Sequence, residues 1–169
     1  MFKKAILSLV FFVCTTVSSA QIQKNILDFT LGTTSKEQVC SYFKSHNIIY
    51  TLGNSGEVVV DGLQFAGWQW GFSHFSFYDN KLYSVQFTST GLGTPEATLD
   101  LLFDKYKNLL SNKYNCYKNA FTSGQLGFSD NEIELTLYYE KYQGVRILSI
   151  EYIHLPLFRR LVKAQEDEL

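Results

Sequence analysis

The spacing of apolar side chains along the chain predicts two amphipathic helices. Residues 95–112 place apolar side chains on one face at helical spacing: Leu99, Leu102, Phe103, Tyr106, Leu109 and Leu110. Thr94 is a suitable N-cap and Pro95 fits the first helical position. A shorter helix is predicted over 35–46, where Thr34 and Glu37 match a capping box. Its apolar face comprises Val39, Cys40, Tyr42 and Phe43.

The segment between these helices has the alternation typical of β-strands. We expect strands over 58–65, 68–78 and 82–88, with an interruption of the first at Asp61-Gly62 and a hairpin turn at Asp79-Asn80. Trp68, Trp70 and Phe72 share one parity, whereas Phe75 and Phe77 share the other. This change of phase predicts a β-bulge or bend near Ser73-His74.

Strand signals return after the second helix. Residues 117–121 and 125–128 predict one or two strands, and residues 133–137 alternate like a half-buried strand. Residues 145–154 are apolar on both faces, which favours a central strand. Residues 155–169 predict a C-terminal helical tail with an acidic end.

The two halves carry similar signals. Leu31-Gly32-Thr33 and Leu92-Gly93-Thr94 each precede a predicted helix that is followed by strands. This spacing of about 61 residues suggests a duplicated α-β-β-β unit, with repeats over 26–90 and 91–154, although the tripeptide could also recur by coincidence. We therefore expect an α+β fold, with two helices packed on one face of a mostly antiparallel sheet.

The first twenty residues have the pattern of a secretory signal peptide. Lys3 and Lys4 precede an apolar run, and Ser18 and Ala20 form a small-x-small cleavage site. An uncleaved anchor and lipid attachment at Cys14 are the competing interpretations. The run is too short to span a bilayer, which needs about 20 apolar residues. We expect cleavage after Ala20, a single mature domain over 21–169, and a periplasmic or secreted location.

Composition narrows the class of partner. Loss of the two signal lysines leaves 13 Lys and Arg against 16 Asp and Glu, a formal net charge of −3. This balance argues against nucleic-acid binding, which needs a basic surface, and no later segment is apolar enough to cross a membrane. Cys40 and Cys116 could form a disulfide in an oxidising compartment, or they could be two separate buried thiols.

Two sets of short motifs resemble known envelope proteins. The run Gly32-Thr33-Thr34-Ser35-Lys36-Glu37-Gln38-Val39 is similar to the helix opening of small bacterial envelope proteins, including SmpA/OmlA-type assembly lipoproteins and β-lactamase-inhibitor-like proteins. The second half resembles Bacteroides-type secreted proteins, many without an assigned function, at 110–114, 133–135 and 150–152. The resemblance implies a fold and an envelope context, without catalytic residues. The chain lacks the lipid-accepting cysteine of the assembly lipoproteins at position 21.

Aromatic residues are the main candidates for a binding surface. Trp68 and Trp70 would point to one side of a strand, flanked by Tyr78 and Tyr83 at the hairpin. If this side is exposed, it could bind a sugar ring or a protein loop, because aromatics supply rigid contact area. If it faces the helices, these residues belong to the core.

Catalytic and metal-binding patterns are weak. His46, His74 and His154 show no metal-ligand spacing, so we expect no metal and no cofactor. A cysteine nucleophile could use Cys40 or Cys116 with His74 or His154. Carboxylates could come from Asp61, Asp79, Glu132 and Glu134, although the last two equally fit a solvated strand face.

Three hypotheses for the function follow. The first is a noncatalytic envelope or secreted interaction module, whose open sheet face binds another envelope or secreted protein. The second is a small secreted hydrolase that uses polar residues such as His74 and Asp61. The third is a glycan- or peptide-binding module that uses Trp68 and Trp70.

Overall fold

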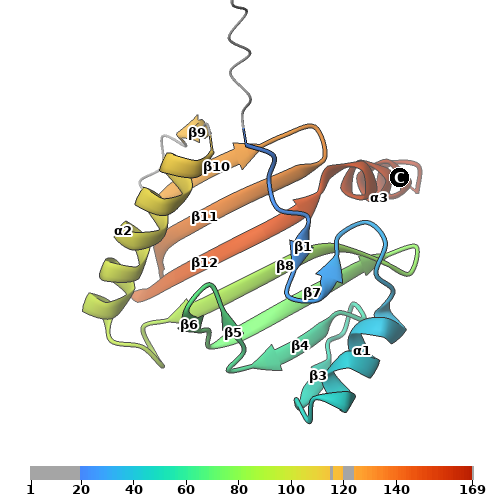
Figure 1. Ribbon diagram of the computed structural model, residues 1–169, viewed down its shortest axis with the longest axis horizontal. Helices are drawn as coiled ribbons and strands as arrows, with labels where there is room; N and C mark the ends of the chain where they lie inside the picture. The colour runs from blue at the N-terminus through green and yellow to red at the C-terminus, as the bar shows by residue number, and fades with distance from the viewer. Residues whose placement is uncertain (1–19, 115, 120–123, 169) are drawn as a thin grey trace, which may run out of the picture.

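A single large antiparallel sheet organises the chain. The structure, a computed structural model, describes residues 20–114, 116–119 and 124–168, so the predicted signal segment before Ala20 lies outside the described residues. The strand order in the sheet is β3-β4-β7-β8-β12-β11-β10-β9 (Figure 1). These strands are β3 (Tyr50–Leu52), β4 (Val58–Asp61), β7 (Phe72–Tyr78), β8 (Lys81–Thr90), β9 (Cys116–Asn119), β10 (Gln125–Ser129), β11 (Ile133–Tyr142) and β12 (Val145–His154).

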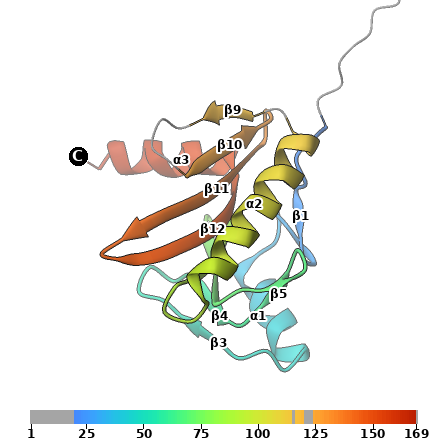
Figure 2. The same ribbon diagram turned by 90° about the vertical axis from the view of Figure 1, so that its left-hand side faces the viewer.

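Two helices cover one face of this sheet. Helix α1 (Lys36–Ser45) lies over the β3–β7 end and α2 (Glu96–Lys113) over the β11–β12 half (Figures 1 and 2). Helix α3 (Leu155–Glu166) follows β12 directly and lies toward the other side (Figure 2). The structure therefore confirms the α+β class and the mostly antiparallel sheet, and α3 occupies the predicted C-terminal helical segment. In the described part of the chain, no helix is long and apolar enough to cross a membrane.

The order of elements is similar in the two halves. The first half contains α1, β3, β4, β7 and β8, with residues 62–71 inserted between β4 and β7, and the second contains α2, β9, β10, β11 and β12. The last strands of the halves, β8 and β12, pair at the centre of the sheet, which confirms the predicted central position of 145–154. The turns before the two helices have the same hydrogen-bond pattern. The backbone N–H groups of Thr33 and Thr34 donate to the Thr30 carbonyl, and those of Gly93 and Thr94 donate to the Thr90 carbonyl.

The core lies between the sheet and the two helices. Strand residues alternate between the faces, and the helix-covered face carries the fully buried Val60, Phe75, Phe87, Leu137 and Ile150. Two small hairpins fill the space beside the helices: β1 (Asn25–Ile26) with β2 (Phe29–Thr30), and β5 (Gln64–Phe65) with β6 (Trp68–Gln69). The Phe29 ring meets those of Phe43 and Phe75 edge to face, and the Phe65 ring stacks on that of Phe87 at 4.1 Å between centroids.

Helix ends differ from the prediction by one residue. The N-cap of α1 is Ser35, whose hydroxyl accepts from the Gln38 amide, while the Gln38 side chain accepts from the Ser35 amide. The capping box is therefore Ser35 with Gln38, since Thr34 instead accepts a hydrogen bond from the Thr30 amide. Helix α2 starts at Glu96 after Pro95. Its predicted stripe is buried at Leu99, Leu102 and Tyr106, but Leu109 is 55% exposed.

The predicted strand over 68–78 is two strands. The first strand, β6, ends at Gln69, and β7 begins at Phe72. Between them, the Gly71 amide donates to the Ser89 hydroxyl and does not continue the backbone hydrogen-bond ladder of a strand. This break places Trp70 in the core and Phe72 on the opposite face. The register irregularity lies at Ser76/Phe77, further along than the predicted Ser73-His74.

The expected Cys40–Cys116 disulfide is not seen in the described part of the structure, where Cys40 is a free thiol. Cys40 lies on α1, which packs on β7 through Phe43 and Phe75. Cys116 begins β9, at the opposite edge of the sheet. Five strand spacings separate β7 from β9, about 24 Å at about 4.8 Å each. A disulfide needs Cα atoms within about 7 Å, so the strand order keeps these cysteines apart.

Candidate functional site

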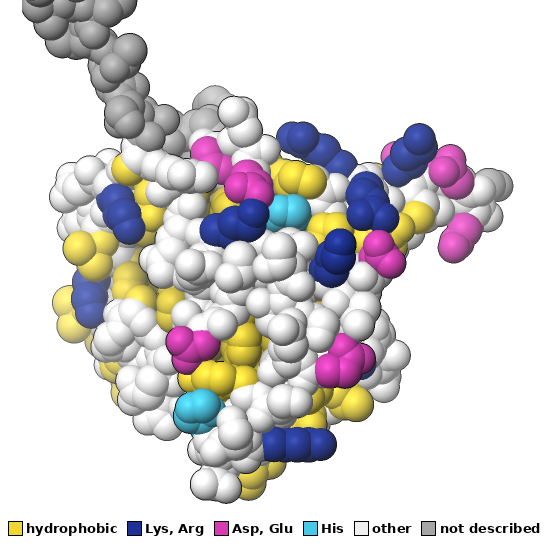
Figure 3. Space-filling model, turned by 45° about the vertical axis from the view of Figure 1, so that its right-hand side comes forward, with side chains coloured by type: hydrophobic (Ala, Val, Ile, Leu, Met, Phe, Trp, Pro, Cys, Tyr) yellow, Lys and Arg dark blue, Asp and Glu magenta, His cyan; other side chains and the backbone are white. Residues whose placement is uncertain are grey.

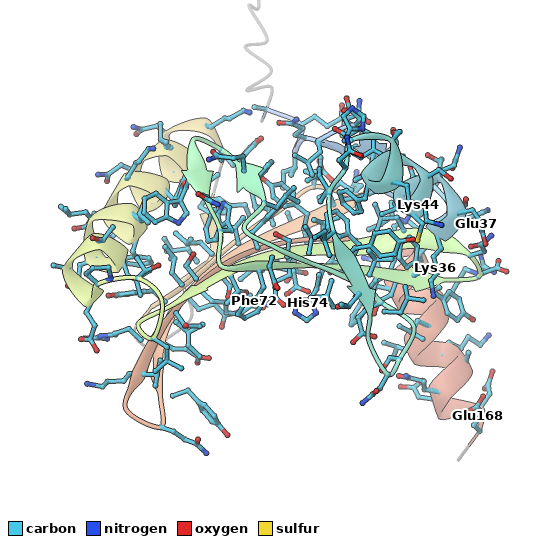
Figure 4. The ribbon with its side chains drawn as sticks, turned by 90° about the horizontal axis from the view of Figure 1, so that it is seen from below. Lys36, Glu37, Lys44, Phe72, His74 and Glu168 are labelled. Atoms are coloured by element: carbon cyan, nitrogen blue, oxygen red, sulfur yellow. The ribbon has the colours of Figure 1, made fainter. Side chains whose placement is uncertain are left out.

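The face of the sheet opposite α1 and α2 is the candidate functional site. Viewed from below, the sheet arches over a hollow, with α1 and α2 above it and the labelled Phe72 and His74 on the underside (Figure 4). Helix α3 descends along one side of this hollow, and the β11–β12 hairpin descends along the other (Figure 4). We call this underside the concave face.

Strand register arranges the concave face in rows. One row runs across β7, β8, β12 and β11 as Phe72, Thr88, Ser149 and Tyr138. The next row runs across the same strands as His74, Gln86, Glu151 and Thr136. These rows contain hydroxyl, amide, imidazole and carboxylate groups, whereas the other face of the same strands is mostly apolar, with Ser73 and Ser89 as buried exceptions.

Two adjoining hollows occupy the concave face. One has a volume of about 430 Å³ and is lined by His74, Ser76, Tyr83 and Ser84 from the sheet and by Leu161 and Gln165 from α3, among others. The other has a volume of about 390 Å³ and lies between Phe72 and Tyr138. Both are lined by Gln86 and Glu151, so the two hollows adjoin each other on the concave face, and we call them together the groove.

Glu151 is the acid shared by both hollows of this groove. Burial raises the pKa of its carboxyl above the ordinary glutamate value, and the nearby charge of Glu134 raises it further. Hydrogen bonds from the hydroxyls of Ser84 and Tyr138 oppose this effect without cancelling it. The Ser84 hydroxyl lies 3.0 Å from the Glu151 carboxylate. A half-buried carboxylate of this kind is typical of functional sites, although structural networks produce it too.

The predicted aromatic platform does not form. Trp70 is fully buried, with its ring stacked on that of Tyr106 and its indole N–H donated to the Phe65 carbonyl at 3.1 Å. Trp68 is partly buried, and its indole N–H donates to the Ser89 hydroxyl at 3.3 Å. The core alternative therefore holds for Trp70, whose ring is not exposed, and both tryptophans also line a separate hollow of about 470 Å³ beside the start of α2.

Tyr78 and Tyr83 flank the β7–β8 hairpin as expected, but α3 covers them in part. The Arg160 guanidinium lies over the Tyr78 ring at 5.8 Å and forms an ion pair with Asp79 at 3.1 Å. The Tyr83 ring stacks near that of Phe158, and its side chain also lines the larger hollow. Of the four predicted binding residues, Tyr83 is the one that lines the groove.

The histidines occupy three separate environments. His46 stacks on Tyr42 at the exposed end of α1, and His154 accepts a hydrogen bond from the Leu157 amide at the start of α3. His74 lies in the groove, where its ring meets that of Phe72 edge to face. Among the described residues, no carboxylate lies within ion-pair distance of His74. The β4–β7 register places Asp61 opposite Phe72, two residues before His74 on β7.

The other candidate groups do not converge on one site. Glu132 contacts Lys24 and the His154 ring at the edge of the covered face, whereas Glu134 belongs to the concave face. In the part of the chain that the structure describes, no group of three His, Cys, Asp or Glu side chains could hold a metal ion.

The central groove residues were missed from the sequence. Residues 145–154 have apolar side chains of both parities, but within this segment Ser149 and Glu151 alternate with Leu148, Ile150 and Tyr152. This period-two polar pattern was the available signal. Gln86 and Thr88 alternate with Val85 and Phe87 in the same way, but only strand pairing shows that the two polar sets adjoin.

Comparisons with protein-family models, with curated proteins and with solved structures find no match to this chain.

Proposed function

We propose that this chain is an exported, noncatalytic interaction module that binds a protein partner on the concave face of its sheet. The observation that carries this proposal is the groove, two adjoining hollows lined largely by polar side chains on a sheet face that α1 and α2 leave open (Figure 4). The hydrophobic core lies on the other face of the sheet. Core packing therefore does not fix the side chains that line the groove, and their shape can match that of a partner. Tyr83, Phe72 and Tyr138 add the aromatic contact area that protein interfaces favour.

Two further parts of the proposal have their support in the sequence. The positive start, apolar run and small-x-small site before Gln21 support export to the periplasm or beyond. The helix-and-four-strand order, which occurs twice, supports descent from a duplicated unit. The helix opening at Gly32–Val39 supports kinship with β-lactamase-inhibitor-like envelope proteins.

Site-specific photo-crosslinking in the source organism tests the binding face. The photoreactive residue benzoylphenylalanine would replace Gln86 or Glu140 in the groove and, as a matched control, Asn108 on the exposed side of α2. We expect the same covalent protein adduct from both groove positions, identified by mass spectrometry, and none from position 108. Adducts that form equally at all three positions, or at position 108 alone, would refute binding on the concave face.

A further inference from the structure

The groove on the concave face has a one-sided charge. Its two hollows are lined by three carboxylates, Glu57, Glu140 and Glu151, and by no lysine or arginine among the described residues. Basic side chains lie over α3, where acidic side chains are interspersed with them (Figure 3) and Arg160 pairs with Asp79. The charged side chains that line the groove are therefore acidic, whereas α3 carries both charges.

The smaller hollow is open to solvent and is bounded by two aromatic rings, and we call it the slot. Phe72 and Tyr138 lie at the two ends of one row. Their backbones are three strand spacings apart across the sheet, or about 14 Å. Between them lie Thr88 and Ser149, whose hydroxyls hydrogen-bond to each other at 2.8 Å. These two small side chains form a low floor between two rings, with the Glu151 carboxylate beside them in the next row.

Glu151 has no cationic partner in the described chain. None of the four ion pairs includes it, and its hydrogen bonds are to the neutral hydroxyls of Ser84 and Tyr138. In the adjoining hollow, Oε2 of Glu57 is shielded from solvent without a hydrogen-bond partner. Desolvated carboxylates destabilise a fold unless a cation or several donors compensate them. A bound cation would supply this compensation in the slot.

We propose that the slot binds an arginine side chain that projects from the partner protein. A guanidinium placed over the Thr88–Ser149 floor could donate hydrogen bonds to Glu151 while its plane faces the ring of Phe72 or Tyr138. Guanidinium groups combine both interactions, a charge-assisted bond to a carboxylate and stacking on aromatic rings. An anionic group would be repelled by Glu140 and Glu151. This inference rests on the proposed function and specifies the chemistry of the partner.

A peptide titration tests the slot without the natural partner. The probe is the capped peptide Gly-Ser-Arg-Ser-Gly, added to the ¹⁵N-labelled chain and followed by NMR. Its control has citrulline, the neutral isostere, in place of arginine. A single-residue contact predicts a Kd of order millimolar, with shift changes at β7, β8, β11 and β12. We expect the citrulline peptide and the Glu151→Gln variant each to weaken binding at least about tenfold, and added salt to weaken it too.

The control variant is Asp104→Asn, an exposed acid on α2, which should bind the arginine peptide like the wild type. Equal binding of the arginine and citrulline peptides, shift changes away from the concave face, or no binding at about 20 mM peptide would each overturn the inference. The citrulline and salt arms need no variant, so they hold even if Glu151→Gln folds poorly.

Crosslinking separates this inference from the proposed function. Glu151→Gln would be combined with benzoylphenylalanine at position 140, and the adduct yield compared with that of the single variant. A fall of at least about fivefold supports the arginine contact. An unchanged yield leaves the proposed function standing and rejects the arginine slot. If neither protein forms an adduct, the proposed function itself fails.

Discussion

Asp130 fastens the start of the domain to the sheet, and its removal should cost a large part of the stability. Its Oδ2 accepts a hydrogen bond from the Ile22 amide at 2.8 Å, and its Oδ1 accepts from the amides of Glu132 and Ile133 at 2.8 and 2.7 Å. Ile22 is 3% exposed and Ile133 is 1% exposed. Water therefore has little access to two of the three donors once the carboxylate is gone.

The expected magnitude follows from these donors. Each buried N–H left without an acceptor costs about 1–3 kcal/mol, so Asp130→Ala should lower the free energy of unfolding by about 3 kcal/mol. The assay is urea unfolding at pH 7 followed by far-UV circular dichroism, with an unchanged slope against urea. Asp104→Ala, on the exposed side of α2, should stay within about 0.5 kcal/mol of the wild type. A loss as small as this for Asp130→Ala would refute the proposed role of the carboxylate.

The same contact should depend on pH. Burial alone would raise the pKa of Asp130, but hydrogen bonds from the backbone amides of Ile133, Glu132 and Ile22 outweigh it and lower the pKa below the ordinary aspartate value. For a lowered carboxyl pKa, the stabilisation is present above the unfolded-state pKa and is lost as pH falls through the folded-state pKa. The stability difference between wild type and Asp130→Ala should therefore shrink from pH 7 toward pH 2. A difference that is constant with pH would contradict this account.

Two further predictions concern the tryptophans and the cysteines. Trp70→Ala should lower the free energy of unfolding by about 3–5 kcal/mol, the usual cost of truncating a buried aromatic side chain, and Trp68→Ala should lower it by clearly less. In Trp70→Phe, acrylamide should quench the fluorescence of the remaining Trp68. Equal losses of stability in the two alanine variants would show that the assignment of Trp70 to the core is wrong. The intact mass of the exported protein should match a chain that starts at Gln21, and it should be the same with and without reductant. After unfolding without reductant, Cys40 and Cys116 should both be alkylated. A mass two units lower without reductant than with it, together with thiols that resist alkylation, would show that the two cysteines form a disulfide.

Local patterns were enough to predict several elements. The α2 stripe of Leu99, Leu102 and Tyr106 repeats at helical spacing and is buried as expected. Asp79-Asn80 forms the predicted turn, with positive φ angles of 52° and 54° at the two residues. Such features depend on neighbours in sequence, and their physical causes are complete within a few residues. Even so, the cap of α1 shifted from Thr34 to Ser35, because two adjacent hydroxyl residues offer the same local interaction.

The fate of the tryptophans depended on contacts that are distant in sequence. Trp68 and Trp70 have the alternation of one continuous strand, but Gly71 donates its amide to the Ser89 hydroxyl and interrupts the ladder. The Trp70 ring stacks on that of Tyr106 in α2. Neither interaction can be predicted from the alternation itself, because each needs the partner segment to be in place.

By itself the sequence determined the α+β class, the helical segments, the central position of 145–154 and the pattern typical of export. Tertiary structure alone decided the separation of Cys40 from Cys116 and the position of the groove. The physical reason is strand pairing. It places β8 beside β12, which brings Gln86 next to Glu151 although they are 65 residues apart, and it sends β7 and β9 to different parts of the sheet. Periodicity assigns a side chain to a face, but only the strand order determines its neighbours on that face.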